Sequence, residues 1–237
     1  MNISKWEWYQ NPKTGQWYRT RSDDWLLYNR IGQDGGRGYQ VQLQDFVRRY
    51  FQLRPARTAL DIGANMGITA IEYAQYFRYV AAFEPVPDVY KQLLLVISKN
   101  GFKNIKPFNV AIGNENKMVK MKYRANNSFA SSVHPHGDQQ VQMKTIDELE
   151  FNDVDFVKID VEGFETEVVN GAWNTIEKCR PLIQFEYKHN LAKKFGYDVD
   201  QLICKRLQKI GYEIIDKKGI TYTATRQKDL FAVPGGK

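Results

Sequence analysis

The sequence has few cysteines and no long apolar run. Only two of its 237 residues are cysteines, and Cys179 and Cys204 do not form a CxxC pair. Two scattered thiols in a chain whose N-terminus shows no signal-peptide core are typical of a reducing compartment, so we expect a cytoplasmic protein. The longest aliphatic run is "LLLVI" at 93–97, whereas a membrane-spanning helix needs about 20 apolar residues. The sequence therefore predicts no membrane span.

Two common phosphate-binding motifs are also missing. The stretch "TALDIGANMGITAIEYAQYF" matches neither GxxxxGK[ST] nor GxGxxG, because its turn holds only Gly63 and Gly67. Such glycines let the backbone approach a ligand, and amides at the start of the following helix can donate hydrogen bonds. Asp61 precedes this turn, and it would repel a pyrophosphate. The turn therefore favours S-adenosylmethionine, which has a sulfonium and an ammonium but no phosphate, over a nucleotide triphosphate or a dinucleotide.

The first 50 residues differ from the rest in composition. The whole chain carries 34 basic and 27 acidic residues, a net charge of +7 that favours acidic partners only modestly. We divide it into a Trp-rich basic segment at 1–50, a cap or an acceptor-recognition element, and a main domain at 51–237. In the first segment "QWYRTR" is typical of a hairpin strand and "VQLQDFVRRYF" of a helix. Its tryptophans are Trp6, Trp8, Trp17 and Trp25.

From residue 58 onward, apolar strands alternate with amphipathic helices. This alternation predicts an α/β fold with a mostly parallel sheet and helices on both faces. The last helix is followed by strand, turn and strand, which predicts an antiparallel hairpin at one edge. We expect strands at 58–62, 79–85, 105–112, 117–124, 154–161, 181–187, 212–216 and 229–234, and helices at 68–77, 88–101, 164–179 and 199–211.

Glu84 supports a ribose-containing cofactor. It ends the second strand, 21 residues after Gly63, where an acid accepts hydrogen bonds from ribose hydroxyls in dinucleotide folds. The third strand should end beside the adenine. The predicted cofactor contacts are Asp61, Gly63, Ala64, Asn65, Gly67, Thr69, Glu84, Pro85, Val86, Asn109, Val110, Ala111 and Asp160.

A second motif, "VKIDVEGFE", places Lys158 inside a buried strand. A lysine there is costly unless it is paired. One interpretation is a buried Lys158–Glu186 ion pair that only fixes geometry. Another is that Lys158 and Asp160 orient or deprotonate an acceptor hydroxyl while Asp160 also meets the methionine ammonium. A third, less favoured, is a divalent cation held by Asp160, Glu162 or Glu186.

Together these motifs resemble the FkbM family of S-adenosylmethionine-dependent methyltransferases. The resemblance runs from Thr58 to Glu186 and rests on DIGAN-x-G followed by KIDVEGFE. It implies a Rossmann-like seven-strand methyltransferase sheet, methylation of a hydroxyl on a sugar or natural product, and S-adenosylhomocysteine as the second product. It also implies cofactor contact for the glycine turn and Glu84, and a cofactor–acceptor floor at Lys158, Asp160, Glu162 and Gly163.

The identity of the base and of the acceptor stays open at this point. Asp160 is one candidate base, and His134 and His136 of "SSVHPHGD" are others because histidine titrates near neutral pH. The same loop offers polar contacts for an acceptor at Ser128, Ser131 and Ser132. Interleaved tryptophans and basic residues also suit single-stranded RNA, which makes ribose methylation an alternative. Against it, Glu186 stands where ribose methyltransferases typically carry a second lysine. A catalytically silent cofactor-binding protein is a further alternative.

Overall fold

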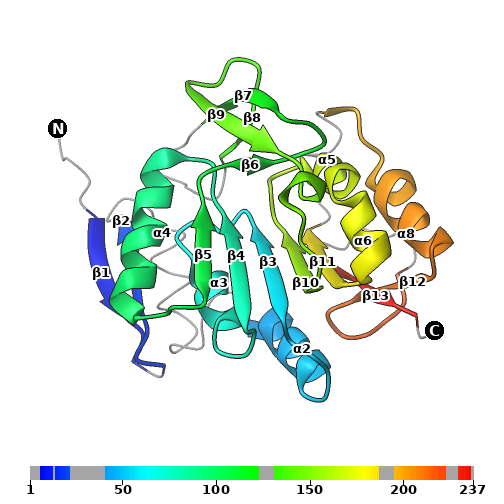
Figure 1. Cartoon of the computed structure of the whole chain (residues 1–237), viewed down its shortest axis with the longest axis horizontal. Helices are drawn as coiled ribbons and strands as arrows, with labels where there is room; N and C mark the ends of the chain where they lie inside the picture. The colour runs from blue at the N-terminus through cyan, green and yellow to red at the C-terminus, as the bar shows by residue number, and fades with distance from the viewer. Residues whose placement is uncertain are drawn as a thin grey trace.

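A seven-stranded sheet forms the centre of the molecule (Figure 1). The computed structural model describes residues 6–12, 14–21, 41–122, 131–186, 195–222 and 229–235. The five strands β11, β10, β3, β4 and β5 are parallel, and β13 and β12 add an antiparallel edge. In spatial order the strands are β12 (Tyr212–Asp216), β13 (Asp229–Pro234), β11 (Leu182–Glu186), β10 (Val154–Ile159), β3 (Thr58–Ile62), β4 (Tyr79–Phe83) and β5 (Ile105–Phe108).

This order confirms the predicted fold class and the C-terminal hairpin. The chain runs from β3 through β4 to β5 in one direction, and later from β10 through β11 in the other. The strand order therefore reverses between β3 and β10. In open parallel sheets, ligands bind outside the carboxyl ends of the strands at such a reversal.

Helices cover both faces of the sheet, as the alternation predicts. Ala59 and Leu60 are fully buried neighbours on β3, but they belong to different core clusters. The cluster with Ala59 includes α2 (Val41–Phe51), α3 (Ile68–Tyr73) and α4 (Pro87–Asn100). The cluster with Leu60 includes α5 (Glu165–Gly171), α6 (Trp173–Cys179), the π-helical turn η4 (Asp200–Cys204) and α8 (Lys205–Lys209). Within the described ranges, none of the helices combines the length and the apolarity that crossing a bilayer requires.

A second, four-stranded sheet lies above the carboxyl ends of β3, β4 and β5 in Figure 1. Its presence corrects one prediction, because 105–112 is not a single strand. The chain leaves the main sheet after Phe108 and re-enters a strand at Ala111, which pairs in parallel with Met143. In spatial order the small sheet contains β6 (Ala111–Ile112), β9 (Gln139–Lys144), β7 (Lys117–Lys122) and β8 (Ser132–Val133).

The helix predicted at 164–179 is also two helices. It breaks at Ala172, whose φ of −114° and ψ of 8° are not helical. The carboxylate of Asp147, in the 3₁₀ turn η2 (Asp147–Leu149), then accepts hydrogen bonds from the amides of Asn174 at 3.1 Å and Thr175 at 2.9 Å. These bonds cap a new helix start, because such amides have no partner within their own helix. The break therefore depends on a residue 25 positions upstream of Ala172 (172 − 147).

Two further helices differ from their predictions. Helix α3 ends at Tyr73, whereas the predicted helix at 68–77 is four residues longer. The stretch predicted as one helix at 199–211 divides into η4 and α8. Helix α2 crosses the division placed at residue 50, and Leu43 and Val47 pack in the same core cluster as α3 and α4. The domain division itself stays a prediction.

The N-terminal strands β1 (Trp6–Gln10) and β2 (Trp17–Arg21) form the expected hairpin and pack against α4. Asn100, the last residue of α4, accepts a hydrogen bond from the Trp17 amide at 2.8 Å and donates one to the Trp17 carbonyl at 2.7 Å. The Lys99 ammonium lies 4.7 Å from the centre of the Trp17 ring, and the Arg19 guanidinium lies 5.1 Å from that of Trp8. These rings are therefore engaged by cations of the chain itself.

The Asn100 contact gives a test of how the hairpin is held. We expect Asn100→Ala to lower the free energy of unfolding by about 1–3 kcal/mol, because both of its hydrogen bonds to Trp17 are lost. Urea denaturation measures the loss, and amide exchange should quicken first in β2. Asn174→Ala, which removes an exposed side chain on α6, is the matched control. Unchanged exchange in β2 would contradict this account of the docking.

Candidate functional site

The glycine turn lies directly against the end of β10. Gly63 has a φ of +82°, and a Cβ added there would lie 2.0 Å from the carbonyl oxygen of Asp160. Gly67, with a φ of +86°, is the N-cap of α3, and its added Cβ would lie 2.5 Å from Leu93. Both positions require glycine, for backbone conformation and for space. The turn and Asp160 are therefore held together at the point where the strand order reverses.

A buried charge network lies beneath this turn. Lys158 on β10 is paired in register with Asp61 on β3, and their Nζ and Oδ1 atoms are 3.2 Å apart. The same ammonium lies 3.6 Å from Oδ2 of Asp160, which is only half-buried. Thr69 on α3 donates a hydrogen bond to Oδ2 of Asp61 at 2.7 Å. Lys158 thus lies near two carboxylates: that of Asp61, which is fully buried, and that of Asp160, which faces the crevice.

Glu84, at the end of β4, is buried next to the glycine turn. Its carboxylate accepts hydrogen bonds from the amides of Asn65 at 3.0 Å and Val86 at 2.9 Å. Burial raises the pKa of Glu84 from 4.5 to about 7, although these two amide donors act in the opposite direction. The carboxyl is therefore poised to change its charge near neutral pH, and a ligand that donates hydrogen bonds to it would favour the ionised form.

These groups surround a crevice of about 860 Å³, including its open mouth. The crevice is lined by most of the predicted cofactor contacts: Gly63, Ala64, Asn65, Thr69, Glu84, Pro85, Val110, Ala111 and Asp160, together with Lys158.

Four predicted contacts are not among the residues that line the crevice. Asp61 holds Lys158 and Thr69 in place, and Gly67 and Val86 shape the two turns beside it. Asn109 donates hydrogen bonds to the carbonyls of Glu84 and Pro85, at 2.9 and 3.0 Å. Its side chain therefore ties the end of β5 to the end of β4.

Sequence reasoning missed most of the residues that close the crevice from above. Met121 and Val133 come from the small sheet, and Phe164 is the N-cap of α5. Because the small sheet forms by pairing distant short strands, no local pattern indicated that Met121 and Val133 face the crevice. Ser131, a predicted acceptor contact just before β8, does line the crevice, and its hydroxyl is buried without a hydrogen-bond partner. Ser128 lies outside the described residues.

Glu165 was also missed. It is 1% exposed, and its carboxylate accepts a hydrogen bond from the Gly163 amide at 3.0 Å. Burial raises its pKa to about 7. The only sequence signal was its place in "VKIDVEGFE".

Three of the predicted acidic residues come together at the crevice rim. Ligand oxygens of Asp160, Glu162 and Glu186 lie within 4.8 Å of one another. Glu162 has a φ of +56°, a conformation that a non-glycine residue adopts only when its surroundings hold it there. This arrangement can receive a cation, either a metal ion or a positively charged group of a ligand. The ion pairs resolved for Lys158 join it to Asp61 and Asp160, which is the arrangement needed for the interpretation that Lys158 and Asp160 act together.

His134 lies apart from this crevice. It lines a second hollow, and its Nδ1 accepts a hydrogen bond from the His136 amide at 3.1 Å. Its assignment as a base stays a prediction, whereas Asp160 faces the crevice directly.

Comparison with known proteins places the chain in a family. The model of the methyltransferase FkbM domain matches residues 61–214. Methyltransferase FkbM from Methylobacillus flagellatus KT has a TM-score of 0.51 at 16% identity, covering 89% of this chain and 58% of its own. A TehB-like SAM-dependent methyltransferase from Corynebacterium glutamicum scores 0.50 at 9% identity, covering 87% and 92%.

A protein of Streptococcus mutans, described as a methyltransferase and solved with SAH, scores 0.50 at 8% identity, covering 80% and 93%. At such identities these likenesses show a shared fold. This chain thus spans only 58% of the Methylobacillus protein. No curated protein matches it in sequence.

The buried Glu84 gives a prediction for stability against pH. Between pH 4.5 and about 7 the folded protein keeps a proton that the unfolded chain has lost, so this carboxyl's contribution to stability falls as the pH rises through that window. Relative to the wild type, Glu84→Gln should therefore gain up to about 3 kcal/mol of unfolding free energy across the window.

Urea denaturation at a series of pH values measures this difference. Glu177→Gln, at an exposed position on α6, should show none. A difference between Glu84→Gln and the wild type that does not change with pH would refute the assignment.

Proposed function

This chain belongs to the FkbM methyltransferase family, and we propose that it transfers the methyl group of S-adenosylmethionine to a hydroxyl oxygen of a sugar or another small polar metabolite. The observation that carries the proposal is the acid-lined crevice at the strand reversal, with Glu84 and Asp160 on its walls. A cationic cofactor with a ribose fits these groups, because its ammonium meets Asp160 and its ribose hydroxyls donate to Glu84.

The residues of the chain then act mainly by position. S-adenosylmethionine supplies an electrophilic methyl group, and the acceptor oxygen must lie about 3 Å from it, in line with the breaking bond. Asp160 accepts the proton of the acceptor hydroxyl, while Lys158 fixes the orientation of that carboxylate from 3.6 Å. The small sheet and Phe164 close the crevice, which excludes water from the reacting atoms.

The described tryptophans give no reason to prefer RNA as the acceptor. Trp8 and Trp17 have Arg19 and Lys99 of the same chain over their rings, whereas stacking on bases needs open ring faces. We therefore favour a small acceptor. Ser131, with its buried and unpartnered hydroxyl, is a further polar group that such an acceptor could meet.

The choice of cofactor is tested by stabilisation of the folded protein. S-adenosylhomocysteine and NAD are added separately, and the melting temperature is followed, since a ligand that binds only the native state raises it. We expect a rise with S-adenosylhomocysteine that is lost in Gly63→Ala, whose Cβ would push the turn away from Asp160. Stabilisation by NAD alone would overturn the proposal.

The role of Asp160 is tested separately. We expect Asp160→Asn to weaken S-adenosylhomocysteine binding about 10-fold, because its contact with the ammonium loses its charge. At saturating S-adenosylmethionine we expect turnover to fall about 10²–10⁴-fold, because general base catalysis contributes that much. Turnover is measured as formation of S-adenosylhomocysteine with a panel of hydroxylated acceptors. Asp88→Asn, at an exposed site on α4, is the control. Full activity in Asp160→Asn would rule out its assignment as the base.

A further inference from the structure

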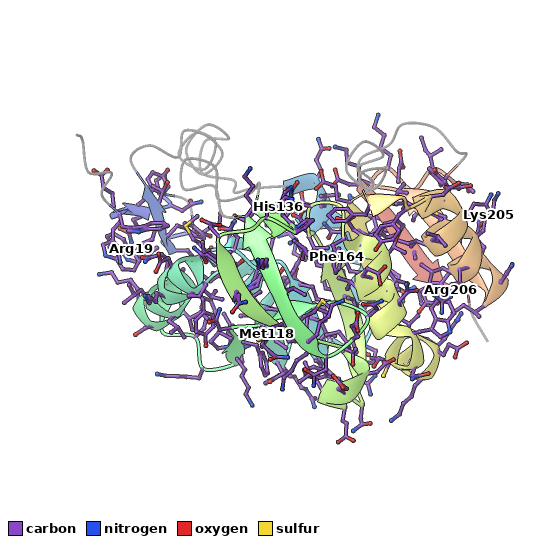
Figure 2. All side chains as sticks on the ribbon, turned by 90° about the horizontal axis from the view of Figure 1, so that it is seen from above. Arg19, Met118, His136, Phe164, Lys205 and Arg206 are labelled. Atoms are coloured by element: carbon purple, nitrogen blue, oxygen red, sulfur yellow. The ribbon has the colours of Figure 1, made fainter. Side chains whose placement is uncertain are left out.

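A second hollow adjoins the cofactor crevice. It encloses about 810 Å³, including its open side, and lies between the small sheet, α5 and residues 195–197. Phe164 and Val133 line both cavities. Seen from above, Phe164 lies between the small sheet and the helices α5 and α6 (Figure 2). The side chains of Phe164 and Val133 thus form part of the boundary between the second hollow and the crevice.

Glu167 gives this hollow a buried acceptor. The residue is 8% exposed, and its Oε2 has no hydrogen-bond partner, whereas Oε1 accepts a hydrogen bond from the Tyr197 hydroxyl. A buried carboxylate oxygen without a donor is costly, and native proteins satisfy most such atoms. The oxygen is therefore suited to a donor that arrives with a ligand, such as a hydroxyl or an ammonium.

An aromatic wall stands beside this carboxylate. The rings of Phe195 and Tyr197 are stacked, with centroids 5.9 Å apart and planes 14° apart, and Phe164 meets Phe195 edge-on at 5.6 Å. All three side chains line the hollow. Flat aromatic faces beside a few fixed polar groups are typical of sites that hold ring-shaped ligands. The C–H groups of a sugar ring fit such faces while its hydroxyls reach the polar groups.

The remaining charged side chains of the hollow come from the small sheet and the residues next to it. Lys117 and Glu115 form an ion pair with each other, and Lys120 and His134 are the other basic side chains that line the hollow. The hollow thus combines one unsatisfied acceptor with basic and amide groups, rather than a field of one sign. This mixture does not select a polyanion, but it can hydrogen-bond several hydroxyls of one ligand.

We infer that the second hollow is the acceptor subsite, and that it binds a polyhydroxylated ring whose hydroxyl or amino group donates to Oε2 of Glu167. The ring lies against Phe195 and Tyr197, and the acceptor extends past Phe164 and Val133 toward Asp160. In this arrangement His134 binds the acceptor and is not the base. This inference rests on the proposed methyl transfer, which it deepens by assigning a place and a chemical class to the acceptor.

The probes are methyl glycosides of hexoses, deoxyhexoses and amino sugars at millimolar concentration, with S-adenosylhomocysteine bound to the full chain. Saturation-transfer NMR detects which of them touch the protein. We expect at least one class to bind, and expect Glu167→Gln and Phe195→Ala each to weaken it about 10-fold or more, because a charged hydrogen bond or a buried ring contact is lost. Tyr197→Phe, which keeps the ring and removes the donor to Glu167, separates stacking from polar recognition.

Two controls keep failure of the subsite distinct from failure of the whole proposal. Glu177→Gln, at an exposed position on α6, should bind the glycosides like the wild type. Calorimetry should give wild-type affinity for S-adenosylhomocysteine in all hollow variants. If S-adenosylhomocysteine binds but no glycoside class does, or if the variants bind glycosides unchanged, the subsite is refuted while methyl transfer stands. If S-adenosylhomocysteine itself fails to bind, the proposed function falls.

Discussion

The buried ion pair between Lys158 and Asp61 is the interaction on which the site depends. It joins β10 to β3 across the place where the strand order reverses, at side chains that are at most 3% exposed. Removing one partner of such a pair costs about 3–5 kcal/mol, because the other charge stays buried. The pair is also anchored at both ends, since Thr69 holds Asp61 and Asp160 shares the ammonium. The helix after the glycine turn and the floor of the crevice are therefore positioned by one set of contacts.

The charge of the crevice is opposite in sign to that of the chain. The protein as a whole carries +7, yet acids crowd the crevice rim, and two buried carboxyls there and beside it have pKa values raised to about 7. Burial keeps Glu84 and Glu165 partly protonated until a ligand provides donors or a positive charge. Repulsion among the acids is thereby limited in the free protein, while a cationic ligand is still favoured. Lys158 serves the same end, because its single positive charge is shared between Asp61 and Asp160 and offsets part of their negative charge.

Features that depend on local pattern could be predicted from the sequence, and features that depend on distant contacts could not. The strand "TALDI", the glycine turn and the acid at the end of β4 follow from periodicity and residue type, and they lie where expected. The split at Asn109 and the break at Ala172 do not, since the first reflects parallel pairing of Ala111 with Met143 and the second a cap from Asp147. The second hollow could not be predicted for the same reason, because its walls come from four separate stretches of chain.

The small sheet and the main sheet have separable tasks, and close backbone contacts lock them together. A Cβ added at Gly171 on α5 would lie 1.9 Å from the carbonyl oxygen of Gly113, which follows β6. This approach fixes the roof of the crevice against α5 without using any of the charged groups of its floor. Within the roof itself, a Cβ added at Gly137 would lie 2.4 Å from the Met121 backbone. Because function resides in sites built onto a shared fold, side chains of the small sheet can differ in shape and polarity while Lys158, Asp61 and Asp160 keep their geometry. Under the proposed function, the added sheet and the aromatic wall would therefore select the acceptor, while the strands beneath would govern the transfer of the methyl group.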